Sequence, residues 1–157
     1  MNSGFEEKKA IRWLWFSLFF AIGLAADQLT KQWAIKNLTQ DSLILIPGIL
    51  NLTLRYNFGS AFGWKIINKE GLILITVFIT IVFLWLFGKV TYLRGVSPFL
   101  AGAWGNLLDR WRFGYVIDFV DPSFWATFNL ADVFIVAGII LIFLSLWFDE
   151  KRENSSL

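Results

Sequence analysis

The sequence predicts an all-α membrane protein with four transmembrane helices and a small β-structured segment outside the membrane. Hydrophobic residues make up 57% of the 157 residues and charged residues only 17%, and the mean hydropathy is +0.60. This composition differs from that of water-soluble domains. Three windows, 13–26, 71–87 and 133–148, contain no charged residue, which favours a lipid bilayer as their solvent.

The absence of two residue types narrows the possible chemistry. The chain has no His and no Cys, which excludes a His-based zinc site, a Ser-His triad, a thiol nucleophile and a disulfide. An enzyme with this sequence must therefore use carboxylates, Lys, Ser or Thr, and we expect no metal and no cofactor. The net charge of +2 is too small to indicate a nucleic-acid partner.

A membrane crossing needs about twenty largely apolar residues, because each helical residue rises about 1.5 Å through about 30 Å of hydrocarbon. The first window extends without a helix breaker through Asp27 and Lys31 to residue 35. The last one opens at Asp132 and closes before a charged tail. In a single integral membrane domain over 1–157, we expect helices over roughly 12–35, 71–90, 95–112 and 132–149.

The third of these helices is the least apolar. Pro98 suits a first helical turn, and Ala101, Gly102 and Gly105 would let this helix pack closely against a neighbour. A re-entrant segment is the alternative, because the stretch is short. With four crossings both termini lie on the same side, and the denser basic residues there favour the cytoplasm.

The segment at roughly 37–64 has a different pattern from the helices. Two short apolar or alternating runs, 43–46 and 50–56, are separated by the turn dipeptide Pro47-Gly48. This pattern predicts a small hairpin or curled sheet on the membrane surface.

Polar side chains at membrane depth are costly, so each is a candidate functional group. Asp27 and Lys31 are four residues apart, which predicts an ion pair with a mainly structural role. Asp109 and Arg110 are adjacent and must find separate partners. The amides Asn57, Asn106 and Asn129 can hold a peptide backbone, and Asn129 can alternatively cap the last helix.

Two further carboxylates suggest a catalytic pair. Asp118 has apolar neighbours on both sides at the exit of the third helix, and Asp132 stands at the entry of the fourth. The short connection between two antiparallel helices can bring them together. Two carboxyl groups that share a site ionise one at a time, so one can activate water while the other hydrogen-bonds a scissile carbonyl. Helix capping remains the alternative for Asp132.

Five motifs make the sequence resemble the lipoprotein signal peptidase family, signal peptidase II, over nearly the whole chain. They are DQLTK at 27–31, NFGSAF at 57–62, GAWGNLLDR at 102–110, GYVIDF at 114–119 and FNLAD at 128–132.

The resemblance implies four transmembrane helices, cytoplasmic termini, a small periplasmic sheet and an active site at the outer face of the bacterial inner membrane. It also implies cleavage of diacylglyceryl-modified prolipoproteins on the N-terminal side of the lipidated cysteine, and inhibition by globomycin. Asp118 and Asp132 match the catalytic pair of the family. The matching substrate-binding or supporting residues are Asn57, Asn106, Asp109, Arg110, Asn129, Asp27 and Lys31. We expect a monomer that meets its substrate in membrane lipid.

Other functions fit parts of the same pattern. Ser60 in a glycine-rich loop and a buried Lys31 would suit a Ser-Lys peptidase, although Asp27 favours a protonated lysine. A small transporter or proton-conducting subunit would also place charged groups among helices. A purely structural subunit would leave the asparagines and the two apolar-flanked aspartates unexplained.

Overall fold

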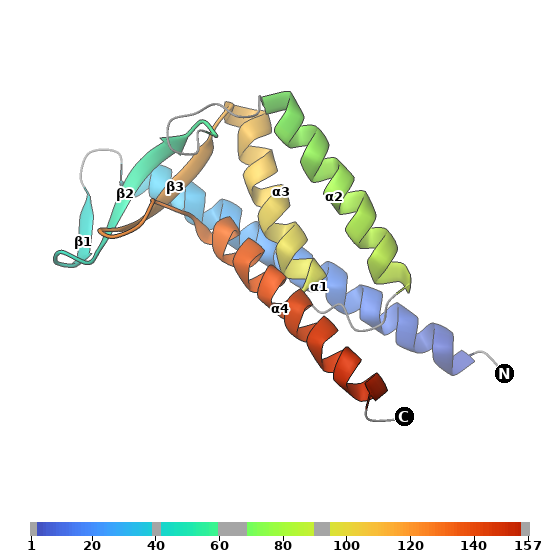
Figure 1. The fold of residues 1–157 in the computed structure, drawn as a ribbon. Helices are drawn as coiled ribbons and strands as arrows, with labels where there is room; N and C mark the ends of the chain where they lie inside the picture. The colour runs from blue at the N-terminus through green and yellow to red at the C-terminus, as the bar shows by residue number, and fades with distance from the viewer. Residues whose placement is uncertain (1–2, 39–41, 60–68, 90–94, 155–157) are drawn as a thin grey trace.

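The computed structural model describes residues 3–38, 42–59, 69–89 and 95–154. Its helices are α1 Ser3–Asn37, α2 Lys69–Lys89, α3 Val96–Phe113 and α4 Leu130–Asn154, and its strands are β1 Leu43–Ile46, β2 Leu50–Asn57 and β3 Val116–Pro122. The sheet lies at one end of the helices, and both chain termini lie toward the other end (Figure 1). The mostly helical architecture with a small sheet agrees with the sequence prediction.

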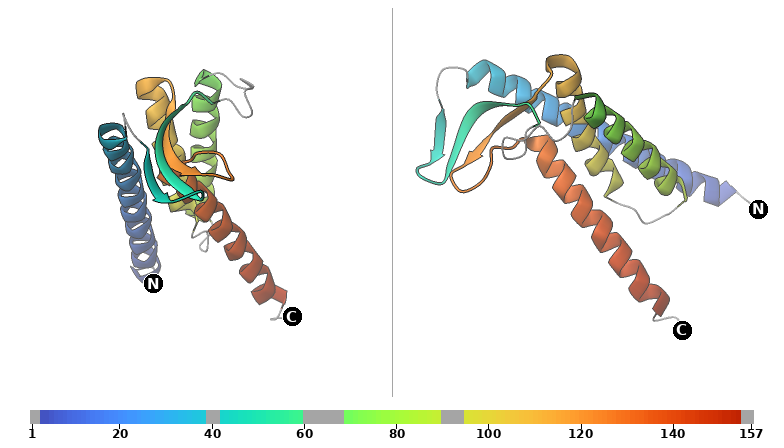
Figure 2. Two further views of the ribbon diagram at one scale, coloured as in Figure 1. Left: turned by 90° about the vertical axis from the view of Figure 1, so that its left-hand side faces the viewer. Right: turned by 45° about the horizontal axis from the view of Figure 1, so that its top comes forward.

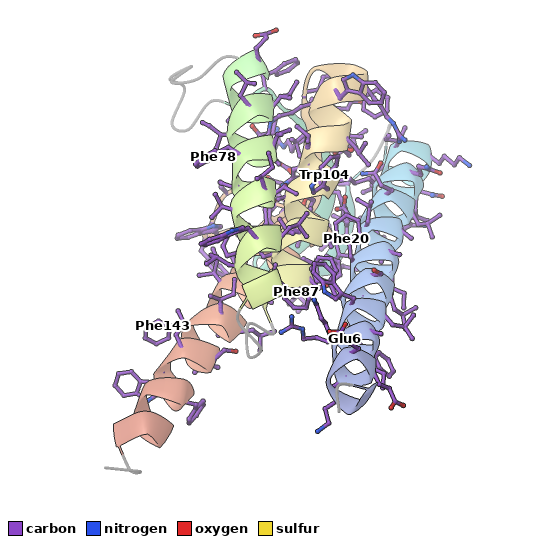
Figure 3. The ribbon with its side chains drawn as sticks, turned by 90° about the vertical axis from the view of Figure 1, so that its right-hand side faces the viewer. Glu6, Phe20, Phe78, Phe87, Trp104 and Phe143 are labelled. Atoms are coloured by element: carbon purple, nitrogen blue, oxygen red, sulfur yellow. The ribbon has the colours of Figure 1, made fainter. Side chains whose placement is uncertain are left out.

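Three helices are long and apolar enough to cross a membrane within the described residues. These segments are Glu6–Asn37 in α1, Glu70–Gly88 in α2 and Leu130–Phe148 in α4. Their outer faces carry large apolar side chains, such as Phe78 and Phe143, which are 67% and 62% exposed and point away from the other helices (Figure 3). Apolar side chains face outward in this way when the surrounding solvent is lipid.

Helix α3 packs against each of the other three helices. A buried apolar cluster joins it to α1 and α2 through Phe16, Phe87, Val96 and Leu100. The predicted small-residue face of α3 is confirmed, because a Cβ on Gly102 would collide with the Ala131 carbonyl of α4. This close approach of two backbones places the beginning of α4 against the middle of α3.

Adding one methyl group at this contact is expected to destabilise the fold. Gly102→Ala should lower the free energy of unfolding by about 1–3 kcal/mol, because the backbone of α4 must move. Gly88→Ala is the matched control, since a Cβ there meets nothing within 4 Å, and it should be neutral or gain at most about 1 kcal/mol. Thermal unfolding in detergent would compare the two; equal stabilities would contradict the close packing.

The sheet has the strand order β1-β2-β3, with antiparallel pairing throughout. The predicted hairpin of β1 and β2 is confirmed, but the sheet extends beyond residues 37–64, because β3 adds a third strand. Gly114 ends α3 in a left-handed conformation with φ of 83° and turns the chain toward this strand. Asp118 therefore lies within β3, opposite Arg55 of β2, and not at a helix end. Residues 60–64 lie outside the described part of the chain.

Candidate active site

Asp118 and Asp132 come from two different elements that meet at the sheet end of the helices. Asp118 belongs to β3 and is 3% exposed, and Asp132 is in the first turn of α4. Figure 2 shows the beginning of α4 beside the sheet. Asn129 connects the two, because its Nδ2 donates to Asp118 Oδ1 at 2.6 Å and its Oδ1 accepts from the Asp132 backbone N–H at 3.0 Å.

The beginning of α4 is held by a reciprocal cap. While Asn129 Oδ1 accepts from the backbone of Asp132, Asp132 Oδ2 accepts from the Asn129 backbone N–H at 3.1 Å. This exchange satisfies two backbone donors that the helix itself leaves free. Asn129 and Asp132 therefore do cap helix α4, as the capping alternative predicted. This cap fixes the position of the Asp132 carboxylate relative to β3.

Each of the three asparagines has its amide orientation set by a donor on its oxygen. Asn57 Oδ1 accepts from the Gly59 N–H at 2.9 Å, and Asn106 Oδ1 accepts from Lys31 Nζ at 3.0 Å. Their NH₂ groups are thereby directed at the carboxylates: Asn57 Nδ2 donates to Asp118 Oδ2 at 2.9 Å, and Asn106 Nδ2 donates to Asp132 Oδ1 at 2.8 Å.

Lys31 forms the centre of a buried ionic cluster next to the asparagines. Its Nζ lies 2.9 Å from Asp27 Oδ2 and 2.8 Å from Asp109 Oδ2, and Lys31 is only 1% exposed. The predicted ion pair of Asp27 and Lys31 is thus present, and Asp109 is its additional partner. Since Lys31 also donates to Asn106, which donates to Asp132, the cluster reaches the candidate catalytic pair through one amide.

Asp27 ties helix α1 to both of its neighbours. Its Oδ1 accepts from the backbone N–H of Ala131 at 2.9 Å, in the first turn of α4, where free N–H groups and the helix dipole favour an anion. Its Oδ2 lies against Gly105 of α3, where a Cβ would collide with it. Asp27 therefore supports the start of α4 and does not itself contact Asp118 within the described hydrogen bonds.

Arg110 is the only predicted site residue with weak bonding in the described structure. Its guanidinium donates to the Asn106 carbonyl at 3.4 Å, and no carboxylate of a described residue lies within salt-bridge distance of it. Asp118 and Asp132 nevertheless act on it electrostatically. Its planar donors suit a carbonyl or phosphate ligand.

The environment of Asp118 favours its protonated form. The pKa of Asp118 is raised from 3.8 to about 6, mainly by burial and also by the charge of Asp132, and the hydrogen bonds from Asn57 and Asn129 oppose part of this rise. A pair of acids that share one proton near neutral pH is what general acid-base catalysis by two carboxyls requires. Within the described residues, no group of three or more carboxylates is positioned to hold a metal ion.

An apolar groove begins at Asp132 and follows one face of α4. It has a volume of about 390 Å³, and its lining comprises Trp125, Phe128, Asp132, Val133, Val136, Ala137 and Ile140. Residues spaced in this way lie on one side of a helix, so the groove runs from the carboxylate along a membrane-spanning element.

The sequence interpretation missed the contribution of Gln28. Its Nε2 donates to Asp109 Oδ1 at 3.1 Å, and its Oε1 accepts from Arg112 at 3.1 Å. The sequence contained one signal for this role, because Gln28 directly follows Asp27. The groove residues were also missed, because their helical spacing is the same as on any lipid-facing helix. Ser60, named in the Ser-Lys alternative, lies outside the described residues, and the amine of Lys31 is paired with two carboxylates.

A family model described as signal peptidase (SPase) II matches residues 19–148. The chain belongs to the signal peptidase II family. A lipoprotein signal peptidase of Syntrophomonas wolfei is 39% identical over 141 residues, covering 86% of this chain and 94% of that protein. One from Coxiella burnetii is 37% identical over 153 residues, covering 87% and 90%.

Two solved structures of membrane enzymes share the fold of this chain. One described as a bacterial membrane enzyme superposes with a TM-score of 0.77 at 31% identity, covering 87% of this chain and 90% of that one. A second, with the same description, gives a TM-score of 0.76 at 31% identity. The chain is thus a peptidase and a multi-pass membrane protein.

Proposed function

We propose that this chain is a membrane aspartic endopeptidase that uses Asp118 and Asp132 to cleave diacylglyceryl-modified prolipoproteins on the N-terminal side of the lipidated cysteine. The observation that carries the catalytic assignment is that Asn129 donates to the carboxylates of both Asp118 and Asp132, and Asp132 lines one end of an apolar groove. Removal of the signal peptide from a prolipoprotein is the activity of the family to which the chain belongs.

The proposed reaction needs one proton shared by two carboxyls. The ionised member of the pair takes a proton from a water molecule, whose oxygen attacks the scissile carbonyl carbon, while the protonated member donates a hydrogen bond to the carbonyl oxygen. When the tetrahedral intermediate collapses, the C–N bond breaks and the leaving nitrogen receives a proton from the pair. The raised pKa of Asp118 supports such proton sharing.

The surrounding polar residues have distinct roles in this proposal. Asn57, Asn106 and Asn129 orient the carboxylates by donating to them, and Arg110 has free donor capacity for substrate carbonyls. Asp27, Lys31 and Asp109 form the ionic cluster that holds α1, α3 and the start of α4 together.

The groove along α4 gives a lipidated substrate a route to the pair. Its walls are apolar side chains, and Asp132 lies at one end. A substrate that carries acyl chains can therefore remain in lipid while its peptide reaches the carboxylates.

We also propose the complete membrane arrangement. Helix α3, with 18 residues, is the fourth crossing, since about 1.5 Å per residue gives nearly the thickness of the hydrocarbon. The chain then forms a single integral membrane domain over 1–157 with cytoplasmic termini, and the active site faces the outer side of the bacterial inner membrane. The enzyme works as a monomer.

Cleavage by the purified protein tests the function. In detergent micelles it should cut a diacylglyceryl-modified prolipoprotein peptide before the modified cysteine, and it should leave the same peptide without the lipid intact. Absence of cleavage of the lipidated peptide would refute the proposal. Flux of ions or protons through proteoliposomes without cleavage would favour the transporter alternative instead.

Asn57 offers a test through pH. Its hydrogen bond lowers the pKa of Asp118, so Asn57→Ala should raise that pKa and move the alkaline limb of the kcat/KM profile to higher pH, because the shared proton is retained longer. Asn51→Ala, on the same strand but paired with Asp121, is the matched control and should leave the limb in place. A shift to lower pH in Asn57→Ala would contradict the assignment.

A further inference from the structure

We propose that the free end of the sheet is embedded in the interfacial region of the lipid bilayer. This surface, called the sheet tip below, consists of residues 43–49 in the β1–β2 hairpin and residues 123–125 in the β3–α4 connection. The position of this surface in the membrane does not depend on which residues are catalytic.

The two parts of the sheet tip form one continuous structure. The Ser123 N–H donates to the Ile49 carbonyl at 2.9 Å, and Leu50 pairs with Pro122 where β2 meets β3. The hairpin turn and the start of the β3–α4 connection therefore lie side by side, far from each other in sequence but adjacent in space (Figure 1).

The apolar side chains of the sheet tip are uncovered on both faces. Side chains along a strand alternate between the two faces of a sheet, yet every residue of β1 is exposed. Ile44 is 61% exposed, Ile49 52%, Phe124 79% and Trp125 73%. A sheet in contact with water on one face normally carries polar residues on that face, so both faces of this strand need an apolar environment.

Charge is absent from the same region. Residues 42–54 and 122–131 contain no Asp, Glu, Lys or Arg. Charged residues are what proteins normally place on an exposed edge strand to prevent edge-to-edge association. Their absence is expected where the surrounding medium is lipid, because a charge there would be costly.

The sheet tip continues the lipid-facing surface of helix α4. Trp125 lines the same groove as Val133, Val136 and Ile140, which lie on the membrane-spanning segment Leu130–Phe148. The apolar surface therefore runs without interruption from the helix to the sheet, and the medium that covers the helix reaches the sheet. Because the two surfaces are continuous, lipid is the medium that covers the sheet tip.

The backbone limits how deeply the sheet tip can enter. Among the described strands β1 pairs only with β2, so its outer edge has free N–H and C=O groups. Hydrocarbon cannot satisfy such groups, whereas headgroups and interfacial water can. Trp125 also suits this depth, since Trp side chains gather at membrane interfaces. The sheet tip thus lies at the level of the headgroups and upper acyl chains, beside the mouth of the groove.

The absence of Cys in the sequence allows a direct test with single-cysteine variants. Ile44→Cys and Phe124→Cys would each carry an environment-sensitive fluorophore in phosphatidylethanolamine and phosphatidylglycerol vesicles. Gly4→Cys, which is exposed and precedes the membrane-crossing segment Glu6–Asn37, is the aqueous control, with iodide on both sides of the bilayer. Phe143→Cys on the outer face of α4 is the control within the hydrocarbon. Quenching would be measured with lipids brominated near the headgroup, with lipids brominated deep in the chain, and with aqueous iodide.

The expected result is a blue-shifted emission for both sheet-tip labels, with the strongest quenching by the shallow brominated lipid. The Gly4 label should respond mainly to iodide and the Phe143 label to the deep bromine. Iodide quenching of the sheet-tip labels equal to that at Gly4 would overturn the proposal. So would disulfide cross-linking of Ile44→Cys between two copies, because that would make a second chain the occupant. If Ile44→Cys does not fold, Leu45→Cys on the opposite face of β1 replaces it with the same expected result.

Discussion

Asp118→Asn is expected to lower the rate of prolipoprotein cleavage by at least about 10²–10⁴-fold, because the loss of one general acid or base typically has this effect. Asp132→Asn should have an effect of the same order, since neither carboxyl can complete the proton transfers alone. The measurement is kcat with a lipidated peptide substrate, at substrate concentrations well above KM.

Loss of structure would not explain this result. Burial raises the pKa of Asp118 to about 6, above its unfolded value of 3.8, so the folded state loses stability as the pH rises through about 6. A neutral Asn removes this loss, and Asp118→Asn should therefore unfold at an equal or higher temperature above that pH. Asn at position 132 retains a side-chain oxygen for the helix cap.

Asp121→Asn is the matched control for the proposed catalytic pair. Asp121 lies on the same strand as Asp118 but accepts a hydrogen bond from Thr127, and it has no described bond to the asparagines of the site. Its substitution should leave kcat nearly unchanged. If Asp118→Asn retained the activity of Asp121→Asn, the assignment of the pair would be wrong.

Lys31→Met is expected to give the largest loss of stability. The substitution keeps the length of the side chain but removes the positive charge between Asp27 and Asp109, all three of which are at most 1% exposed. Removing one partner of a buried ion pair costs about 3–5 kcal/mol, because an uncompensated charge remains. Chemical unfolding in detergent would measure the change.

Two further variants define the origin of that loss. Lys36→Met removes an exposed lysine near the end of the same helix and should change the unfolding free energy by less than about 0.5 kcal/mol. Combining Lys31→Met with Asp109→Asn should recover part of the stability, because one unpaired carboxylate is then neutral. A double variant less stable than Lys31→Met would contradict the electrostatic explanation.

The polar residues of the candidate site could be selected from the sequence, because charged and amide side chains are costly within apolar segments. A carboxylate or amide within an apolar segment costs free energy in lipid, so it indicates either a polar partner or a function. This reasoning found Asp27, Lys31 and Asp118, and the spacing of four residues predicted the first ion pair. It did not find that Asp109 joins the same lysine, since no local spacing relates helix α1 to helix α3.

Strand β3 could not be predicted from the local sequence pattern. Five mostly apolar residues after Gly114 fit a connection between helices as well as a strand, and only their pairing with β2 decides between the two. The asparagines show the same limit. Each can donate or accept, and it is the Gly59 N–H, the Lys31 amine and the Asp132 N–H that fix their oxygens and direct their NH₂ groups to the carboxylates.

The sequence by itself determined the solvent, the helices and the chemistry of this protein, because composition, apolar length and the lack of His and Cys are local or global properties of the chain. The tertiary structure decided which groups meet. Close packing at Gly102 and Gly105 brings α3 to the start of α4 and to Asp27, and the sheet brings Asp118 to Asn129. Contacts between distant segments depend on this packing, which no short stretch of sequence encodes.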